Sequence, residues 1–286
     1  MKVIRAGISG FCMGVRRAVE LAMREASHGG RNVYTLGPLI HNPAVLETLA
    51  GQGIKVLKEG ECPGDPKASA VIIRAHGIRP DAERELVRLG VTVLDATCPH
   101  VKANQKKAGL LSSRGVTVFL AGEREHAEII GIRGYVQGPC YSIANPAEAE
   151  AAASELARTK STARTALIGQ TTISPEEYSA IGSVIKRYFP DIEIINTICG
   201  ATRERQDSLR ELCGKVDAVI IAGGRESANA RRLLAVAESC GKKAWLVENA
   251  AAIPREIRAY ETAGLSAGAS TPDSVIDAIE EALGSL

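Results

Sequence analysis

Three cysteines stand at matching places in the sequence, each directly after a strand-like run and before a helix-like one. They are Cys12 in Ser9-Gly-Phe-Cys-Met-Gly14, Cys98 in Asp95-Ala-Thr-Cys-Pro99 and Cys199 in Asn196-Thr-Ile-Cys-Gly200. Such a thiol lies at the carboxyl edge of a sheet, where the helix N-terminus stabilises a thiolate. Three converging thiolates predict either a Zn²⁺ site with a mixed ligand set or an iron–sulfur cluster with one iron lacking a cysteine ligand. The alternative is three small residues buried at strand ends.

Two sets of polar residues repeat with the cysteines. The first set is His41, His126 and Ser227, with Asn229 beside the serine; 29 residues separate Cys12 from His41, and 28 separate the later cysteines from His126 and Ser227. The second set is His76, Thr171 and Ser270, each after a strand-like run. All are donors suited to phosphate oxygens, and hydrogen bonds to charged groups contribute roughly 1.5–3 kcal/mol each. The pattern therefore predicts a diphosphate site without an Arg or Lys clamp.

Glu128 is the candidate proton donor, because it follows His126 by two residues. In an extended segment the two side chains share a face, so Glu128 would deliver a proton where His126 binds an anion. A nearby diphosphate would raise the pKa of the carboxyl group and favour its acid form. The alternative is a solvated glutamate like its neighbours Glu123 and Glu125.

The elements that position these residues alternate between Val- and Ile-rich runs and amphipathic segments of helical period. We expect strands at 71–73, 91–94, 116–120, 192–195 and 218–221, and helices at 81–89, 101–111, 175–188, 204–212 and 230–239. The Ala- and Glu-rich segment 144–161 is expected to form mostly a solvated helix. This alternation predicts an α/β protein with parallel sheets and right-handed crossovers.

The repeat predicts three similar α/β lobes with parallel sheets around a pseudo-threefold axis, each giving one thiol to the middle. The expected boundaries are 13–97 for the first lobe, 98–198 for the second and 199–286 for the third. The third lobe is completed by the N-terminal strand, residues 1–12, if the C-terminal strand and helix pair with it.

Composition restricts the classes of function. The 286 residues are 45% hydrophobic and 24% charged with a net charge of +2, which is ordinary for a soluble protein. With 3% aromatic residues and no long charge run, neither a nucleic-acid partner nor a membrane-surface partner is expected. No apolar run approaches the roughly 20 residues of a membrane span, and no signal peptide is evident, so a cytoplasmic location is expected.

Together these motifs resemble the 4-hydroxy-3-methylbut-2-enyl diphosphate reductase family, whose members catalyse the last step of the methylerythritol phosphate route of isoprene biosynthesis. The resemblance covers essentially the whole chain. Its motifs are Gly10-Phe-Cys-Met-Gly-Val15, Gly37-Pro-Leu-Ile-His-Asn-Pro43, Arg74-Ala-His-Gly77, Asp95-Ala-Thr-Cys-Pro99, His126-Ala-Glu128, Gln170-Thr-Thr172, Ser227-Ala-Asn229 and Ala267-Gly-Ala-Ser270.

The resemblance implies an oxidoreductase whose three α/β lobes form a pseudo-threefold trefoil around a central iron–sulfur site, a [4Fe–4S] cluster bound by Cys12, Cys98 and Cys199. It implies that the allylic hydroxyl is removed with two electrons and protons, giving isopentenyl and dimethylallyl diphosphates, and that ferredoxin or flavodoxin is the electron donor. The implied diphosphate ligands are His41, His76, His126, Ser227, Asn229 and Ser270. Thr171 would lie beside the substrate hydroxyl, and Glu128 would deliver the proton. The chain departs from the family at Ala228, where the family often has a serine.

Two other functions stay open from the residues alone. An iron–sulfur hydro-lyase acting on a hydroxylated substrate would use the same open iron but would need no reductant. A zinc-stabilised or phosphometabolite-sensing protein would contain zinc and no iron. Electron stoichiometry and metal content separate these functions from the reductase.

Overall fold

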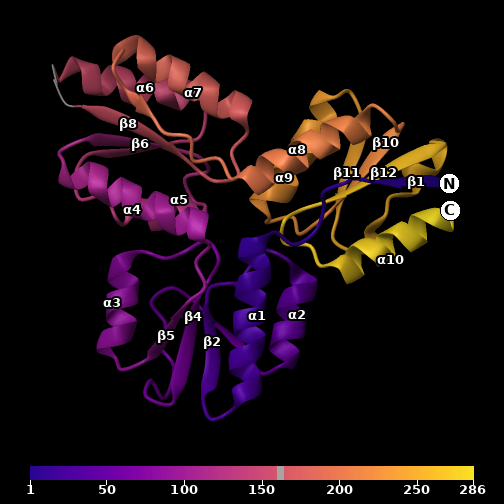
Figure 1. Cartoon of the computed structure of the whole chain (residues 1–286), viewed down its shortest axis with the longest axis horizontal. Coiled ribbons are helices and arrows are strands. Elements are labelled where there is room, and N and C mark those ends of the chain that lie inside the picture. Colours follow the sequence, from indigo (N-terminus) through magenta and orange to yellow (C-terminus); the bar gives the residue numbers. More distant parts are fainter. Residues whose placement is uncertain (160–163) are drawn as a thin grey trace. The chain divides into compact units, whose positions relative to one another are not determined.

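The computed structural model describes residues 1–159 and 164–286, in which strands and helices alternate along the chain (Figure 1). The strands are β1 (Lys2–Arg5), β2 (Asn32–Leu36), β3 (Lys55–Leu57), β4 (Ser69–Ile73), β5 (Thr92–Asp95), β6 (Thr117–Ala121), β7 (Cys140–Ile143), β8 (Thr165–Gly169), β9 (Glu193–Ile194), β10 (Ala218–Ala222), β11 (Lys243–Val247) and β12 (Thr262–Ala267). The α-helices are α1 (Met13–His28), α2 (Pro43–Gly51), α3 (Pro80–Arg88), α4 (Pro99–Ser113), α5 (Ala127–Arg133), α6 (Pro146–Arg158), α7 (Pro175–Tyr188), α8 (Gly200–Cys213), α9 (Ala228–Ser239) and α10 (Asp273–Gly284). Two short 3-10 helices, η1 (Ala250–Ala252) and η2 (Arg255–Ala259), precede β12.

The strands form three four-stranded sheets with one common order. The orders are β3-β2-β4-β5, β7-β6-β8-β9 and, read in the same direction, β11-β10-β12-β1. In each sheet the second strand is followed by a residue of the first polar set, and the third strand is followed by a residue of the second polar set. The fourth strand, at one edge of the sheet, is followed by one of the three cysteines. The strands pair in parallel in β1–β12, β10–β11, β10–β12, β4–β5, β6–β7, β6–β8 and β8–β9. The expected repeat of α/β lobes with parallel sheets is thus confirmed.

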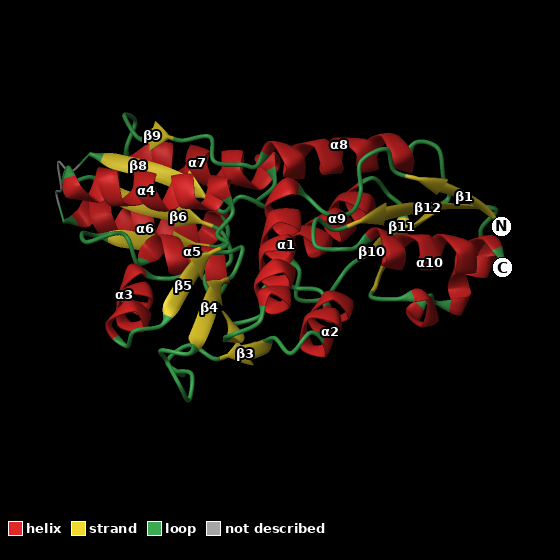
Figure 2. Cartoon of the chain, turned by 60° about the horizontal axis from the view of Figure 1, so that its bottom comes forward, coloured by secondary structure: helices red, strands yellow, loops and turns green. Residues whose placement is uncertain are grey.

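The N-terminal strand completes the sheet built by the C-terminal part of the chain. β1 pairs in parallel with β12, from Lys2 opposite Thr262 to Arg5 opposite Leu265. Helix α10 packs against the same two strands, and both chain ends lie in this part of the molecule (Figure 2). This confirms that the last strand and helix pair with the first strand.

The chain divides into two compact units, Met1–Val56 with Gly200–Leu286, and Leu57–Cys199. In the second unit, helices α6 and α7 cover one face of the β6–β8 sheet and α4 and α5 cover the other (Figure 1). Successive residues of β6 alternate between the layers, because Phe119 packs with α6 and α7 whereas Val118 and Leu120 pack with α4 and α5. Burial on both faces explains why such strands read as continuous apolar runs.

The first unit has the same layered construction around β10. Val219 and Ile221 pack with α8 and α9, whereas Ile220 packs with α10 on the opposite face. All five residues of β10 are buried. The sheet is therefore held between two helical layers, and its carboxyl edge is left to the connecting loops.

The expected elements are present, with ends that differ by a few residues. Helix α8 begins at Gly200, four residues before the expected start, because the small Ala201 is the one apolar residue in its first turn and does not reveal the helical period. The run 192–195 gives only the two-residue edge strand β9, and both residues are exposed. Within the expected helix 144–161 the structure has α6, and residues 160 and 161 lie outside the described residues. The lobe boundaries 13–97, 98–198 and 199–286 stay a prediction.

Candidate active site

The three predicted thiols each lie in a connection between an edge strand and a helix. Cys12 and Cys98 are the residues that precede the first turns of α1 and α4, and Cys199 directly precedes α8. Their backbone N–H groups donate to the carbonyls of Ala269, Ala75 and Thr171, at 3.1, 2.9 and 3.0 Å. Each of these loops carries a residue of the second polar set. These backbone hydrogen bonds therefore join each cysteine to a loop that carries one of the predicted substrate ligands.

The chemistry of these thiols fits a metal centre. All three are half-buried, and none is in a disulfide. Neither Cys12 nor Cys98 uses its sulfur to cap the helix that follows it. Partly exposed sulfurs at helix N-termini are suited to be thiolate ligands, and thiolates are the common ligands of iron–sulfur clusters.

In the second unit His126 caps helix α5. Its Nδ1 atom accepts a hydrogen bond from the N–H of Glu128 at 3.2 Å. In the neutral ring the proton is therefore on Nε2, which makes this atom a hydrogen-bond donor. The edge of the neighbouring His76 ring meets the His126 ring with centroids 5.3 Å apart.

The expectation that His126 and Glu128 share a face of an extended segment is wrong. Glu128 lies in the first turn of α5, where residues two apart do not face each other. The carboxylate instead points to Thr171, whose N–H donates to Oε1 at 2.7 Å and whose hydroxyl donates to Oε2 at 2.8 Å. His126 and Glu128 are instead linked through the backbone, because the N–H of Glu128 donates to Nδ1 of His126.

Glu128 is buried, with 1% of its surface exposed. Burial raises the pKa of its carboxyl group to about 7, against the two hydrogen bonds from Thr171, which lower it. A carboxyl group with this pKa is partly protonated near neutral pH and is matched to proton transfer there. The alternative of a solvated glutamate does not hold for Glu128.

In the first unit three strand-to-helix connections meet. The hydroxyl of Ser270 lies 3.4 Å from the hydroxyl of Ser227 and donates to the carbonyl of His41 at 3.3 Å. Ser227 also caps α9, because its Oγ accepts from the N–H of Ala230. Asn229 joins the group through its Oδ1 atom, which accepts from the N–H of Ala269 at 3.0 Å. The structure thus brings together the four first-unit residues predicted to bind the diphosphate.

The amide of Asn229 has an unused donor. Its Nδ2 atom is buried and has no hydrogen-bond partner among residues 1–159 and 164–286. Leaving a buried donor unsatisfied costs about 1–3 kcal/mol, which a ligand oxygen would recover. This observation is what a phosphate-binding role of Asn229 requires.

Gly224 is needed for the close approach of two of these loops. A Cβ atom at this position would lie 2.5 Å from the carbonyl oxygen of His41. Only glycine lets the β10–α9 connection pass the backbone of His41 without a displacement. The sequence contained a signal, the Gly223-Gly224 pair after a strand, but no ground for choosing this role.

Gln170 positions two loops of the candidate site, a role that its place in the motif Gln170-Thr-Thr172 did not indicate. It is fully buried; its Oε1 accepts from the N–H of Glu123, and its Nε2 donates to the Thr172 hydroxyl, both at 3.0 Å. It therefore joins the loop before His126 to the loop of Thr171. Its place beside Thr171 in the motif was the only available signal.

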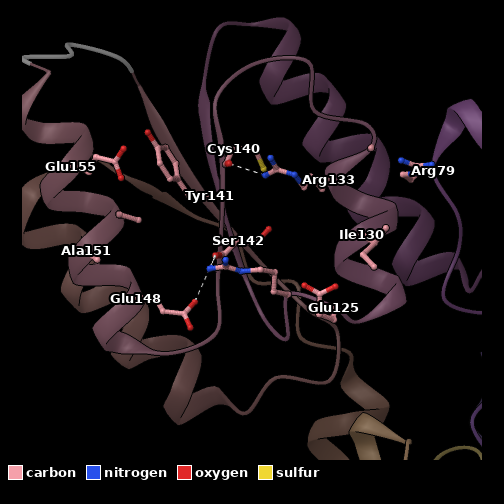
Figure 3. Close-up of a pocket in the computed structure, with 13 residues that line it drawn as sticks. Arg79, Glu125, Ile130, Arg133, Cys140, Tyr141, Ser142, Glu148, Ala151 and Glu155 are labelled. Carbon is pink, nitrogen blue, oxygen red and sulfur yellow. Dashed lines mark hydrogen bonds and ion pairs between the residues drawn. The ribbon is translucent and has the colours of Figure 1, made fainter.

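A cavity of about 770 Å³ lies elsewhere in the second unit, between α5, β7 and α6 (Figure 3). Two of its charged lining residues have partners within the lining: Arg124 pairs with Glu148 at 3.3 Å, and Arg133 donates to the carbonyl of Cys140 at 2.8 Å. None of the predicted site residues lines it. We therefore place the candidate site at the strand-to-helix connections and not in this cavity.

The fold and these residues define an α/β protein whose candidate ligand-binding groups follow the carboxyl ends of parallel strands, where α/β proteins bind ligands. The LytB protein family matches residues 3–284, and the chain belongs to this family. A 4-hydroxy-3-methylbut-2-enyl diphosphate reductase of Treponema denticola is 44% identical and covers 99% of each chain. The reductase of Desulfovibrio desulfuricans is 39% identical over the full length of both chains.

Two solved structures show the same fold. A diphosphate reductase from Plasmodium falciparum superposes with a TM-score of 0.89, covers 98% of this chain and 87% of its own, and at 24% identity supports the fold alone. A structure of (E)-4-hydroxy-3-methyl-but-2-enyl diphosphate reductase, 35% identical, covers all of both chains with a TM-score of 0.70. The family resemblance expected from the motifs is confirmed. Among the described residues, no helix is long and apolar enough to cross a membrane.

Proposed function

We propose that the chain is an iron–sulfur oxidoreductase that removes the allylic hydroxyl of 4-hydroxy-3-methylbut-2-enyl diphosphate. The products are isopentenyl and dimethylallyl diphosphates, and the reaction consumes two electrons and two protons. Membership of the LytB family and the activity of its relatives support the substrate class. The single observation that carries the proposal is the buried Glu128 carboxyl group, held by Thr171 with a pKa of about 7.

We assign Cys12, Cys98 and Cys199 as the ligands of a [4Fe–4S] cluster. Their half-buried thiols and their places at the starts of helices suit this role. When bound, the cluster supplies electrons and an iron that acts as a Lewis acid toward the allylic oxygen. Ferredoxin or flavodoxin is the proposed electron donor.

The diphosphate is assigned to the two polar sets. The proposed ligands are His41, His76, His126, Ser227, Asn229 and Ser270. The unused Nδ2 donor of Asn229 and the Nε2–H of His126 support this assignment. Hydrogen bonds to ionised oxygens are about twice as strong as neutral ones, so several of them hold a diphosphate without a lysine or arginine.

Glu128 supplies the proton for the leaving hydroxyl. In its acid form the carboxyl group donates to the hydroxyl oxygen, which departs as water when the carbon–oxygen bond breaks. The Thr171 hydroxyl donates to the carboxyl group and fixes its orientation, and we assign the same hydroxyl to contact the substrate hydroxyl. Burial keeps bulk water from the carboxyl group, which sustains the raised pKa.

The test is an anaerobic assay with a reduced dye as electron donor. The proposal predicts that dye oxidation and product formation are coupled, with about two electrons consumed for each product molecule. A hydro-lyase would convert its substrate without the reductant, and a zinc-stabilised binding protein would show no turnover. Either result would contradict the proposed reaction.

A further inference from the structure

Two cysteines outside the candidate site lie at the corresponding ends of adjacent helices. Cys213 is the last residue of α8, and Cys240 is the C-cap residue directly after α9. The two helices pack side by side on one face of the sheet that contains β10 (Figure 1). They lead into β10 and β11, whose first residues, Ala218 and Lys243, are paired neighbours. Both cysteines therefore lie near the amino edge of this sheet.

The side chains of the two cysteines face each other. Cys213 belongs to the same core cluster as Val236 and Ala237 of α9. Cys240 follows Val236 by four residues and thus lies on the same side of α9. The two thiols are close enough to share a hydrogen bond, which contributes to the raised pKa of Cys213. Proximity and orientation are what disulfide formation requires.

The two thiols differ in their access to solvent. Cys240 is exposed, whereas 2% of the Cys213 surface is accessible. Burial, and then the neighbouring Cys240, raise the pKa of Cys213 to about 11, so its thiolate is scarce. An oxidant from solvent therefore meets Cys240 first and finds Cys213 behind it as a resolving thiol.

We propose that Cys213 and Cys240 form a reversible disulfide when the protein meets hydrogen peroxide. The peroxide converts the Cys240 thiol to a sulfenic acid and leaves as one water molecule. The Cys213 sulfur then attacks the Cys240 sulfur, and the sulfenic oxygen leaves as a second water molecule. Two thiols and one peroxide thus give one disulfide and two waters, and a small dithiol reverses the step by exchange.

The experiment treats the anaerobically prepared holoenzyme with stoichiometric peroxide, blocks remaining thiols and analyses tryptic peptides by mass spectrometry. The expected product is a disulfide between the peptide Glu211–Lys215, with the sequence ELCGK, and the peptide Leu233–Lys242, with the sequence LLAVAESCGK. Its mass is the sum of the two peptides less two hydrogens, and dithiothreitol abolishes it. Absence of this pair while Cys240 is oxidised to sulfinic acid would overturn the proposal.

Two variants and a control separate this chemistry from general oxidation. In Cys213→Ala the resolving thiol is gone, so the sulfenic acid at Cys240 accumulates and is trapped by dimedone. Cys240→Ser changes an exposed residue and should leave Cys213 unoxidised. Cys62→Ser removes another exposed thiol and should leave the disulfide unchanged.

Identifying the linked peptides keeps the result independent of oxidation at Cys12, Cys98 and Cys199. If the same fraction of Cys213 escaped thiol blocking after peroxide treatment in wild type and in Cys240→Ser, the proposal would be overturned.

Discussion

Thr171 holds both oxygens of the Glu128 carboxylate, one through its backbone N–H at 2.7 Å and the other through its hydroxyl at 2.8 Å. The loop after β8 thus fixes a buried acid in the first turn of α5. The fixed geometry and the pKa of about 7 are the two properties that a proton donor at neutral pH needs.

Replacing Glu128 by glutamine should abolish most of the turnover. Glutamine keeps the size and can accept one hydrogen bond, but it cannot donate a proton as an acid. We expect kcat to fall by about 10²-fold or more, the usual contribution of a general acid, while the protein stays folded. The reduced-dye assay measures this, and Glu125→Gln in the preceding loop is the matched control. Full turnover in Glu128→Gln would remove the proposed role.

Turnover should depend on a group with a pKa of about 7. Because Glu128 acts in its acid form, kcat/KM should fall as the pH rises through about 7, roughly tenfold for each further unit. A bound diphosphate favours the acid form of Glu128. The alkaline limb of the pH profile, where the constant falls, should therefore lie at a higher pH for kcat than for kcat/KM. Profiles of both constants check this. A profile that is flat through this range, or one whose limb persists in Glu128→Gln, would speak against the assignment.

Thr171→Val should move this limb to higher pH. The hydroxyl of Thr171 stabilises the ionised carboxylate, so its loss raises the pKa of Glu128. A hydrogen bond to a charged group is worth about 1.5–3 kcal/mol, which corresponds to a shift of at least about one pH unit. Thr171→Ser restores the hydroxyl and should return the limb toward its wild-type position. A limb that moves to lower pH in Thr171→Val would contradict the hydrogen-bond geometry.

Gly224→Ala should weaken binding of the diphosphate substrate. The added Cβ meets the carbonyl oxygen of His41 at 2.5 Å, so the two loops must separate. We expect a rise in KM and a loss of about 1–3 kcal/mol of stability, as for other forced overpacking. Gly51→Ala is the control, because no atom lies within 4 Å of its added Cβ. Steady-state kinetics and thermal unfolding measure both effects, and an unchanged KM in Gly224→Ala would show that the loop contact is not needed.

Much of this fold was readable from the sequence because its central strands are buried on both faces. β6 is apolar from Val118 to Ala121 and β10 is apolar throughout, and a polar residue caps the helix that follows each strand. Edge strands carry a weaker signal, since β9 is only two exposed residues long. The repeat of 28 or 29 residues indicated the candidate site positions even where the sequence signal of the strands was weak.

The contacts made by backbone atoms could not be predicted from the pattern. The hydrogen bond from the N–H of Glu128 to the capping residue His126 depends on where α5 begins, and no periodic pattern of apolar residues in the sequence indicated that start. The approach of Gly224 to His41 joins residues far apart in the sequence. Such details follow from how loops of different strands pack together, and a single sequence records only that the residues are present.

The central claim is that Cys12, Cys98 and Cys199 bind one iron–sulfur cluster. Its most direct test is to count iron and acid-labile sulfide per chain after anaerobic reconstitution, in wild type and in each Cys→Ser variant. The account predicts about four of each in wild type, from the cluster stoichiometry, and a deficient or labile cluster in all three variants. A colourless protein with one zinc per chain, or a normal cluster in Cys98→Ser, would contradict it.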